Sequence, residues 1–351
     1  MENDMKVGLL TRFFNLRNAG IGRYSVELRD GLYKNGVDVY PVISGIYEER
    51  SDIYYLYNTF GLPFKTPRGC DIYHALSPIE ALYLPLKEKT IVTVHDLIPL
   101  LHFDRIMSIK PKKGEQLVRN LERRYFRIAC RMASKCTTII CVSHETKRDM
   151  MTTFGVPEDK FHVIRQGIYE NLWRSAKPKE DDIFRVGTVS SLDPRKRVDS
   201  LIQAFKKADI ENSELLIGGN GVEKEKLVNL AGNDKRIKFI GFVPDEKLGD
   251  FYASLDLFCF PSYVEGYGLL PIEALACGTP AVTLRDAIIP EEVTKHTHVT
   301  SLDELAETLC SFNDNKINAS PDDIQWARNH SWDKTVSSTI EVYREVMSLS
   351  R

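Results

Sequence analysis

The chain has 351 residues and lacks the sequence marks of several protein classes. No apolar run approaches the ~18 residues that span a bilayer, and the start of the chain has no signal-peptide pattern. A net charge of −2 gives no reason to expect nucleic acid as a partner. The seven cysteines include no Cys-x-x-Cys pair, so we expect reduced thiols and a cytoplasmic protein.

Two further absences limit the chemistry. The sequence contains no Asp-x-Asp pair, which is one way to hold a divalent metal on a diphosphate. We therefore expect a reaction without a metal, and the sequence predicts no cofactor. Gly20 and Gly22 could open a dinucleotide fingerprint, but Ser25 stands where its third glycine is required. This argues against a nicotinamide-dependent dehydrogenase.

Strands and helices alternate along both halves of the chain, which predicts α/β domains with parallel sheets covered on both faces. We expect two Rossmann-like, doubly wound domains at residues 1–172 and 183–330, with a polar linker between them. Residues 331–351 are expected to form a final helix. The expected strands are Lys6 to Thr11, Val37 to Ile43, Asp71 to Leu76, Thr90 to His95, Thr137 to Val142, Phe184 to Ser190, Glu214 to Gly218, Lys238 to Gly241 and Asp256 to Phe260.

The most informative stretch runs from Pro261 to Pro280 and holds two carboxylates, Glu265 and Glu273. The apolar run before it predicts a strand, and Ile272 to Cys277 predicts a helix with Pro271 as its first residue. Glu273 would then lie in the first helical turn, beside N–H groups that attract a phosphate. Carboxylates next to an anion site suit the hydroxyls that flank the diphosphate of a nucleotide sugar.

Each carboxylate also has an ordinary structural explanation. Glu265 could be an exposed loop acid or the partner of a nearby lysine. Glu273 could cap the helix as its N3 residue. That second explanation lacks the expected Ser or Thr, because Leu270 occupies the capping position. We therefore favour ligand binding for the pair.

A basic turn, Arg195 with Lys196, follows the first strand of the second half. Two cations there can stabilise negative charge on a departing diphosphate without a metal. A solvated surface turn is the alternative explanation. Because ligands of open α/β sheets lie beyond the carboxyl ends of the strands, we expect this turn and Glu265 in one site.

Together these motifs resemble those of the retaining GT-B glycosyltransferases of family 4 (glycosyl transferases group 1), and most of all the mannosyltransferase-type members. Glu265 and Glu273 match the family's Glu-x7-Glu motif. The resemblance implies the GT-B fold, in which two Rossmann-like domains face each other across a cleft and the last helix crosses back to the N-terminal domain. It also implies that the N-terminal domain binds the acceptor and the C-terminal domain the nucleotide sugar. The other similar segments are Ala19 to Tyr24, Val92 to Pro99, Cys141 to Lys147, and Val186 to Thr188 with Asp193 to Lys196.

The resemblance implies roles for individual residues. Glu265 is expected to face the donor sugar and Glu273 the ribose. His95 is expected to hydrogen-bond the transferred sugar, although a lone histidine at a strand end is more often structural. The implied catalytic residues are Glu265, Arg195, Lys196 and His95. The implied donor-binding residues are Gly20, Thr188, Arg195, Lys196, Val243, Glu265, Gly266, Tyr267, Gly268, Leu269, Leu270 and Glu273.

Some of these assignments have specific reasons. Thr188 stands where many family members carry an arginine, so Arg195 is expected to take over that role. Backbone atoms of Val243 are expected to read the base. Gly266 and Gly268 allow the backbone to approach a ligand closely.

The implied reaction is the transfer of a hexose, with retention and without a metal, from a GDP- or UDP-linked sugar to a glycan or lipid-linked acceptor. The segment from His95 to Pro99 most resembles mannose-using relatives, so GDP-mannose is the first expectation for the donor. No protein nucleophile is expected. The alternatives are a GT-B sugar-nucleotide epimerase and a catalytically silent nucleotide-sugar-binding protein.

The segment from about Lys113 to Ser134 predicts a long basic helix. A core-facing helix with a solvated basic side is one explanation. Attraction to anionic lipid is the other, and it would bring the protein into peripheral contact with the cytoplasmic face of a membrane. Apolar residues recur along this helix at Leu117, Leu121, Tyr125, Ile128 and Met132.

Overall fold

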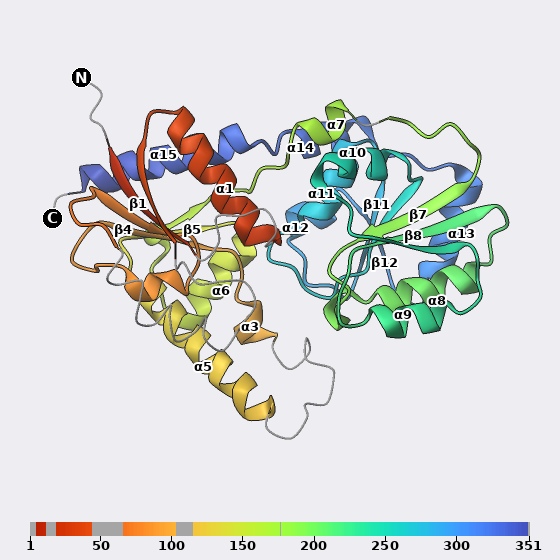
Figure 1. Ribbon diagram of the computed structural model, residues 1–351, viewed down its shortest axis with the longest axis horizontal. Helices are drawn as coiled ribbons and strands as arrows, with labels where there is room; N and C mark the ends of the chain where they lie inside the picture. Colours follow the sequence, from red (N-terminus) through yellow and green to blue (C-terminus); the bar gives the residue numbers. More distant parts are fainter. Residues whose placement is uncertain (1–4, 12–18, 44–65, 103–114, 176, 350–351) are drawn as a thin grey trace. The chain divides into compact units, whose positions relative to one another are not determined.

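The computed structural model describes residues 5–11, 19–43, 66–102, 115–175 and 177–349, which form two α/β units (Figure 1). The first unit comprises Met1–Leu101, Pro111–Gly167 and Trp332–Arg351, and the second comprises His102–Lys110 and Ile168–Ser331. The long continuous segment of the second unit therefore begins at Ile168 and ends at Ser331.

The sheet of the first unit has six parallel strands in the order β2-β1-β3-β4-β5-β6. Its central strands are almost entirely buried, as expected for a parallel sheet that helices cover on both faces. The strands are β1 (Lys6–Thr11), β2 (Asp38–Ile43), β3 (Ile72–Ala75), β4 (Thr90–Val94), β5 (Thr138–Cys141) and β6 (Phe161–Val163). The helices are α1 (Ala19–Lys34), α3 (Ile98–Leu101), α5 (Glu115–Ala133), α6 (His144–Phe154) and α15 (Trp332–Ser348), with 3-10 turns η1 (Glu80–Tyr83) and η2 (Glu158–Lys160).

The sheet of the second unit also has six parallel strands, in the order β12-β11-β10-β7-β8-β9. The prediction of two doubly wound, Rossmann-like parallel sheets is confirmed. The strands are β7 (Phe184–Val189), β8 (Ser213–Gly218), β9 (Ile237–Gly241), β10 (Leu257–Phe260), β11 (Ala281–Leu284) and β12 (His298–Thr300). The helices are α7 (Asn171–Arg174), α8 (Val198–Ala208), α9 (Lys224–Ala231), α10 (Asp245–Ala253), α11 (Leu269–Ala276), α12 (Glu291–Thr294), α13 (Leu305–Asn315) and α14 (Pro321–Arg328), with the 3-10 turn η3 (Pro194–Lys196).

Helix α5 lies along the outer side of the first unit (Figure 1) and buries a different face from the one that its apolar spacing suggests. Its buried residues are the small side chains Ala129, Cys130 and Ala133. The large residues of the apolar series are exposed: Leu117 is 66%, Leu121 54% and Ile128 53% exposed. The explanation of this series as core-facing is therefore wrong for these three residues, whereas Phe126 on a neighbouring face of the helix packs against the core.

Helix α15 packs on the rest of the first unit through a buried network of neutral polar groups. His74 on β3 lies 2.7 Å from the Tyr343 hydroxyl through Nδ1 and 2.9 Å from the Thr93 hydroxyl through Nε2. Burial, and secondarily His95, lower the pKa of His74 to about 3, so its ring is neutral at physiological pH. Because His74, Thr93 and Tyr343 are neutral and hydrogen-bonded to one another, the free-energy cost of burying them is small.

Helices α1 and α15 approach each other closely at a glycine. A Cβ added to Gly31 would lie 2.3 Å from Cγ2 of Val336. Gly20, in the first turn of α1, has no heavy atom within 4 Å of the corresponding position. α1 begins at Ala19, so Gly20 lies in the helix and not in a loop before it.

We predict that Gly31→Ala lowers the free energy of unfolding by about 1–2 kcal/mol. Overpacking typically costs about 1–3 kcal/mol, and the better helix propensity of alanine returns up to about 1 kcal/mol. Urea unfolding of Gly31→Ala, the matched control Gly20→Ala and the double variant Gly31→Ala/Val336→Ala measures the effect. Equal stability of the two single variants would contradict the close approach, and the double variant should recover part of the loss.

Candidate active site

The second sheet has one point at which the direction of strand addition reverses. In chain order, β8 and β9 are added to one side of β7, whereas β10, β11 and β12 are added to its other side. β7 and β10 are therefore neighbours. Ligands of open α/β sheets bind outside the carboxyl ends of the strands at such a point. Two loops leave the sheet there, η3 after β7 and residues 262–268 after β10.

A compact cluster of charges joins these two loops. Glu265 Oε1 lies 2.6 Å from Lys196 Nζ and 2.9 Å from Arg195 Nη1, and it also accepts a hydrogen bond from the Ser262 hydroxyl. The side chains are well shielded from solvent, with Lys196 9% and Glu265 14% exposed. Lys196 also lies 5.5 Å from the centre of the Phe260 ring. The predicted proximity of the basic turn to Glu265 is therefore present in the structure.

The two cations keep Glu265 ionised. Burial alone would raise the pKa of its carboxyl group, but the positive charges of Lys196 and Arg195 outweigh burial and hold the pKa below its ordinary value of 4.5. Glu265 is thus a fixed negative charge at neutral pH. A carboxylate in this state accepts hydrogen bonds and suits the hydroxyl groups of a sugar.

The loop that carries Glu265 is fastened to η3 by its backbone. The amide of Tyr263 donates to the Arg195 carbonyl at 2.8 Å, and Arg195 Nη1 donates to the Val264 carbonyl at 2.7 Å. Arg197, with φ of 49°, donates through Nε to the Pro261 carbonyl at 2.8 Å. Asp193 caps η3 by accepting from the Arg195 amide at 3.1 Å. These bonds fix where the cations lie relative to Glu265.

Glu273 is placed differently from the sequence-based expectation. α11 begins at Leu269, with Gly268 as its N-cap at φ of 95°, so Pro271 is its third residue and Glu273 lies beyond the first turn. The predicted start at Pro271 and the placement of Leu270 at the cap are wrong, because glycine adopts this left-handed conformation without the steric cost that other residues have. The predicted helix end at Cys277 lies one residue beyond the end of α11 at Ala276. Gly278 has φ of 90° and donates to the Leu275 carbonyl at 2.9 Å, as in a Schellman motif.

The Glu273 side chain is held within the second unit by a tyrosine that the sequence analysis missed. Glu273 is 1% exposed and accepts a hydrogen bond of 2.8 Å from the Tyr252 hydroxyl on α10. Tyr252 is 21 positions away in sequence, so no local pattern identifies it. The N3-capping explanation for Glu273 does not apply, because Glu273 is not in the first helical turn.

The carboxyl end of β7 carries two buried hydroxyl groups without a partner in the described part of the chain. They are Thr188 Oγ1 and Ser190 Oγ. A buried hydroxyl without a hydrogen bond is costly, which makes both groups candidates for a ligand contact. Thr188 was predicted from the family resemblance, whereas Ser190 was missed because a lone serine carries no sequence signal.

Glycines bring neighbouring backbone segments against this end of β7. Gly219 has φ of 111°, and a Cβ there would lie 1.8 Å from the Ser190 carbonyl oxygen. Val243, the predicted base-reading residue, lies beside Gly218, since a Cβ on Gly218 would be 3.1 Å from its Cγ2. Val243 therefore follows β9 at the same edge of the sheet as Thr188.

The remaining predicted donor residues of this unit lie on or next to the Glu265 loop. Gly266 is half-buried, and Tyr267 and Gly268 are buried. Leu269 and Leu270 form the half-buried first turn of α11. The structure thus groups these residues around the end of β10.

Two predicted residues, His95 and Gly20, belong to the first unit. His95 follows β4 and donates through Nε2 to the Leu76 carbonyl at 3.0 Å, with its ring edge-on to Tyr24 at 4.7 Å. These contacts match the structural explanation for a strand-end histidine and also fix the orientation of the ring. Gly20 is exposed in the first turn of α1.

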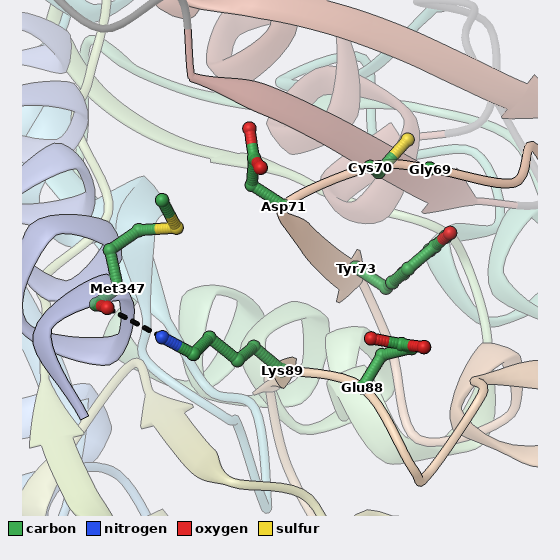
Figure 2. A pocket seen from close by; sticks show the side chains of 7 residues that line it. All are labelled: Gly69, Cys70, Asp71, Tyr73, Glu88, Lys89 and Met347. Carbon is green, nitrogen blue, oxygen red and sulfur yellow. Dashed lines mark hydrogen bonds between the residues drawn. The ribbon is translucent and has the colours of Figure 1, made fainter. Parts of the chain in front are cut away.

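The first unit has a hollow at the amino ends of its strands (Figure 2). Asp71 and Lys89 in its wall immediately precede β3 and β4, so it opens at the amino ends of these strands. Lys89 donates to the Met347 carbonyl at 2.5 Å across it (Figure 2). Because ligands of such sheets bind at the carboxyl ends, this hollow is not the candidate active site.

We predict that Glu265→Gln lowers the free energy of unfolding at neutral pH by about 3–5 kcal/mol, since it leaves the buried Lys196 and the half-buried Arg195 without their anion. Because the pKa of Glu265 is lower in the folded state, its contribution is present above 4.5 and is lost as the pH falls through the folded-state pKa. The stabilities of wild type and variant should therefore converge in acid. Urea unfolding at a series of pH values measures this, with the exposed Glu225→Gln as control. A constant difference down to acid pH would contradict the pairing.

Two known families match the chain. The family described as Glycosyl transferases group 1 matches residues 170–319, and the one described as Glycosyltransferase Family 4 matches residues 19–171. The candidate cluster lies within the first match, and His95 and Gly20 lie within the second.

Individual relatives and a solved structure agree with these matches. O-antigen chain mannosyltransferase B of Escherichia coli is 30% identical over 169 residues, which cover 44% of this chain and 44% of the relative. MMP alpha-(1->4)-mannosyltransferase of Mycolicibacterium hassiacum is 27% identical over 240 residues, covering 62% of this chain and 56% of the relative. The chain thus spans about half the length of these curated relatives. Sucrose-phosphate synthase from Thermosynechococcus elongatus, 18% identical, has a TM-score of 0.75 and covers 99% of this chain and 100% of that chain, which confirms the GT-B fold.

Proposed function

Because this chain belongs to family 4 of the GT-B glycosyltransferases, we propose that it transfers a hexosyl unit from a nucleotide diphosphate sugar to a glycan or lipid-linked acceptor. The observation that carries the proposal is the shielded cluster of Arg195, Lys196 and Glu265 at the point where β7 and β10 adjoin. Two cations suit a diphosphate, and an ionised carboxylate suits the hydroxyls beside it.

The cluster fits the charge changes of glycosyl transfer. In the proposed reaction the bond from the sugar C1 to the phosphate oxygen breaks, and its electron pair stays on the diphosphate. Arg195 and Lys196 stabilise that charge, and because Glu265 already holds them in place, little reorganisation is needed when the charge develops.

The same geometry suits transfer with retention and without a protein nucleophile. The acceptor oxygen bonds to C1 on the face that the diphosphate leaves, and its proton passes to the departing phosphate oxygen. The protein then contributes positioning and electrostatics. Glu265, Glu273 and His95 are assigned to hydroxyl contacts, and Thr188 with Ser190 offers two further hydroxyls to the donor.

For the donor we propose GDP-mannose. The support is the resemblance of the His95–Pro99 segment to mannose-using relatives and the mannosyltransferase names of two similar proteins. The backbone of Val243 would read the base, which leaves UDP-linked sugars as the competing donors. A thermal-shift panel of GDP-, UDP- and ADP-sugars without metal separates them, since a ligand that binds the native state raises Tm by mass action.

Two other functions make different predictions about nucleotide release. A sugar-nucleotide epimerase would release nucleotide without an acceptor, so nucleotide release with and without added acceptor distinguishes the two enzymes. A silent nucleotide-sugar-binding protein would bind donor and turn nothing over. The presence of both Arg195 and Lys196 beside Glu265 argues against a protein that binds nucleotide sugars without catalysis.

We predict that Lys196→Ala lowers kcat by about 10²–10³-fold, the range found when one preorganised group that stabilises developing charge is removed. The exposed Lys207→Ala on α8 is the matched control and should leave the rate unchanged. Transfer should also continue in excess chelator. Strict dependence on manganese or magnesium, or full activity of Lys196→Ala, would contradict the proposed role.

We also propose that the enzyme works in the cytoplasm, in contact with the anionic surface of a membrane. Among the described residues, no helix is long and apolar enough to cross a bilayer. One face of α5, however, exposes apolar and basic side chains together, which is the composition of helices that lie in the plane of a membrane interface. The exposed residues of this face are Leu117, Leu121, Arg124, Arg127, Ile128 and Arg131.

Charge reversal on this face tests the contact. Each cation near an anionic surface contributes about 1 kcal/mol, so Arg124→Glu/Arg127→Glu should weaken binding to phosphatidylserine vesicles by at least about tenfold. The control Lys207→Glu/Lys235→Glu makes the same change in net charge on exposed residues of the second unit. Co-sedimentation measures the binding. Equal binding of the two double variants, or binding that does not depend on anionic lipid, would remove the proposal.

A further inference from the structure

The loop that carries Glu265 is held on both sides of that residue. Before and at Glu265, backbone bonds add to those from Arg195 and Arg197, since the Glu265 amide donates to the Ile288 carbonyl at 2.9 Å and the Ile288 amide donates to the Tyr263 carbonyl at 2.7 Å. Beyond Glu265, the side chain of Tyr267 holds the loop. The Tyr267 ring is 5% exposed, and its hydroxyl lies 2.7 Å from Nε2 of His330.

The direction of this hydrogen bond follows from the other ring nitrogen. Nδ1 of His330 lies 3.1 Å from the Trp326 carbonyl and 3.2 Å from the Ala327 carbonyl. Carbonyl oxygens only accept, so Nδ1 carries the proton. In the neutral ring Nε2 is then an acceptor, and the Tyr267 hydroxyl donates to it.

The backbone of His330 is hydrogen-bonded to the first residue of the continuous segment 168–331. Its carbonyl accepts a hydrogen bond of 3.0 Å from the Ile168 amide, and Ile168 forms a parallel β-bridge with Ser331. These two residues begin and end the continuous segment of the second unit. His330 therefore contacts the Glu265 loop through its ring and the paired segment ends through its backbone.

Neighbouring aromatic side chains pack against the ring of His330 and restrict its rotation. The Trp326 indole meets it edge-on with centres 4.7 Å apart, and Trp326 in turn stacks on His296 at 3.9 Å. His296 Nδ1 lies 2.7 Å from Asp323 at the start of α14. A shift of the Tyr267 hydroxyl is therefore transmitted to the backbone more readily than it is absorbed by rotation of the imidazole.

We propose that His330 is a positioning residue that couples the Glu265 loop to the pairing of residues 168 and 331. The inference rests on the proposed donor site at that loop. A nucleoside diphosphate that prefers one geometry of the loop stabilises the Tyr267–His330 bond and, through it, the Ile168–His330 bond. The coupling is reciprocal, so loosening the segment ends weakens donor binding.

The test is amide hydrogen exchange at Ile168 with and without GDP, and separately with UDP. In the wild type, the nucleotide that binds slows exchange of this amide. In Tyr267→Phe, which removes one hydroxyl and keeps the ring, most of that slowing is lost. The KM for GDP-mannose rises about 3- to 10-fold, the size of one hydrogen bond, while kcat changes less than about twofold.

Matched variants separate positioning from a general loss of stability. Tyr33→Phe removes a hydroxyl that donates to the Val39 carbonyl at 2.8 Å in the first unit, and it leaves both readouts unchanged. His330→Gln keeps an acceptor for Tyr267 and retains more of the response than His330→Leu. A GDP-induced slowing at Ile168 that is the same in wild type and Tyr267→Phe overturns the inference. Failure of the wild type to bind either nucleotide overturns the proposed function and this coupling with it, whereas binding without any response at Ile168 overturns the coupling alone.

Discussion

The pairing of Glu265 with Arg195 and Lys196 is the interaction on which the arrangement of the candidate site depends. Removing charges from water costs several kcal/mol per ion unless each charge is paired and hydrogen-bonded. Lys196 and Glu265 are 69 positions apart, so only the fold can bring them together. The doubly wound order does this by making β7 and β10 neighbours, which places their following loops at one edge of the sheet.

This constraint explains why the two loops are fastened so heavily to each other. Arg195 and Arg197 each donate to carbonyls of the Glu265 loop, and the backbone adds a further bond at Tyr263. A site that stabilises developing charge gains most when its dipoles and cations are in place beforehand. The arginines therefore provide positive charge and also hold the loop through hydrogen bonds to its backbone carbonyls. The planar guanidinium has five donors and suits this second role better than the ammonium group of lysine.

The sequence was sufficient where the structure follows local rules. Nine of the twelve described strands were predicted because apolar runs of this length have few alternatives, whereas the short strands β6, β11 and β12 were not predicted. The start of α11 was misplaced, since Pro271 is equally tolerated anywhere in the first turn, where the amides have no partner. The core-facing prediction was wrong for Leu117, Leu121 and Ile128 of α5, because helical spacing of apolar residues does not show which face meets the core. The Tyr252–Glu273 and Tyr267–His330 bonds join distant positions, and a single sequence holds no record of such pairs.

Both units bury polar groups, and in the second unit several of them gather at one place in the sheet. The first unit uses neutral groups, His74, Thr93 and Tyr343, which hydrogen-bond one another and hold α15. A neutral network of this kind shows that the chain can meet a structural need without charge. In the second unit a buried Lys196 and a half-buried Arg195 pair with the half-buried Glu265, and the Thr188 and Ser190 hydroxyls have no partners in the described residues, all at the carboxyl ends of adjoining strands. Departures from ordinary packing rules that gather at one place are typical of functional sites. Glu265 is the partner of Lys196, as its structural explanation expects, and an anionic ligand flanked by hydroxyl groups is the further role that we propose for the same cluster.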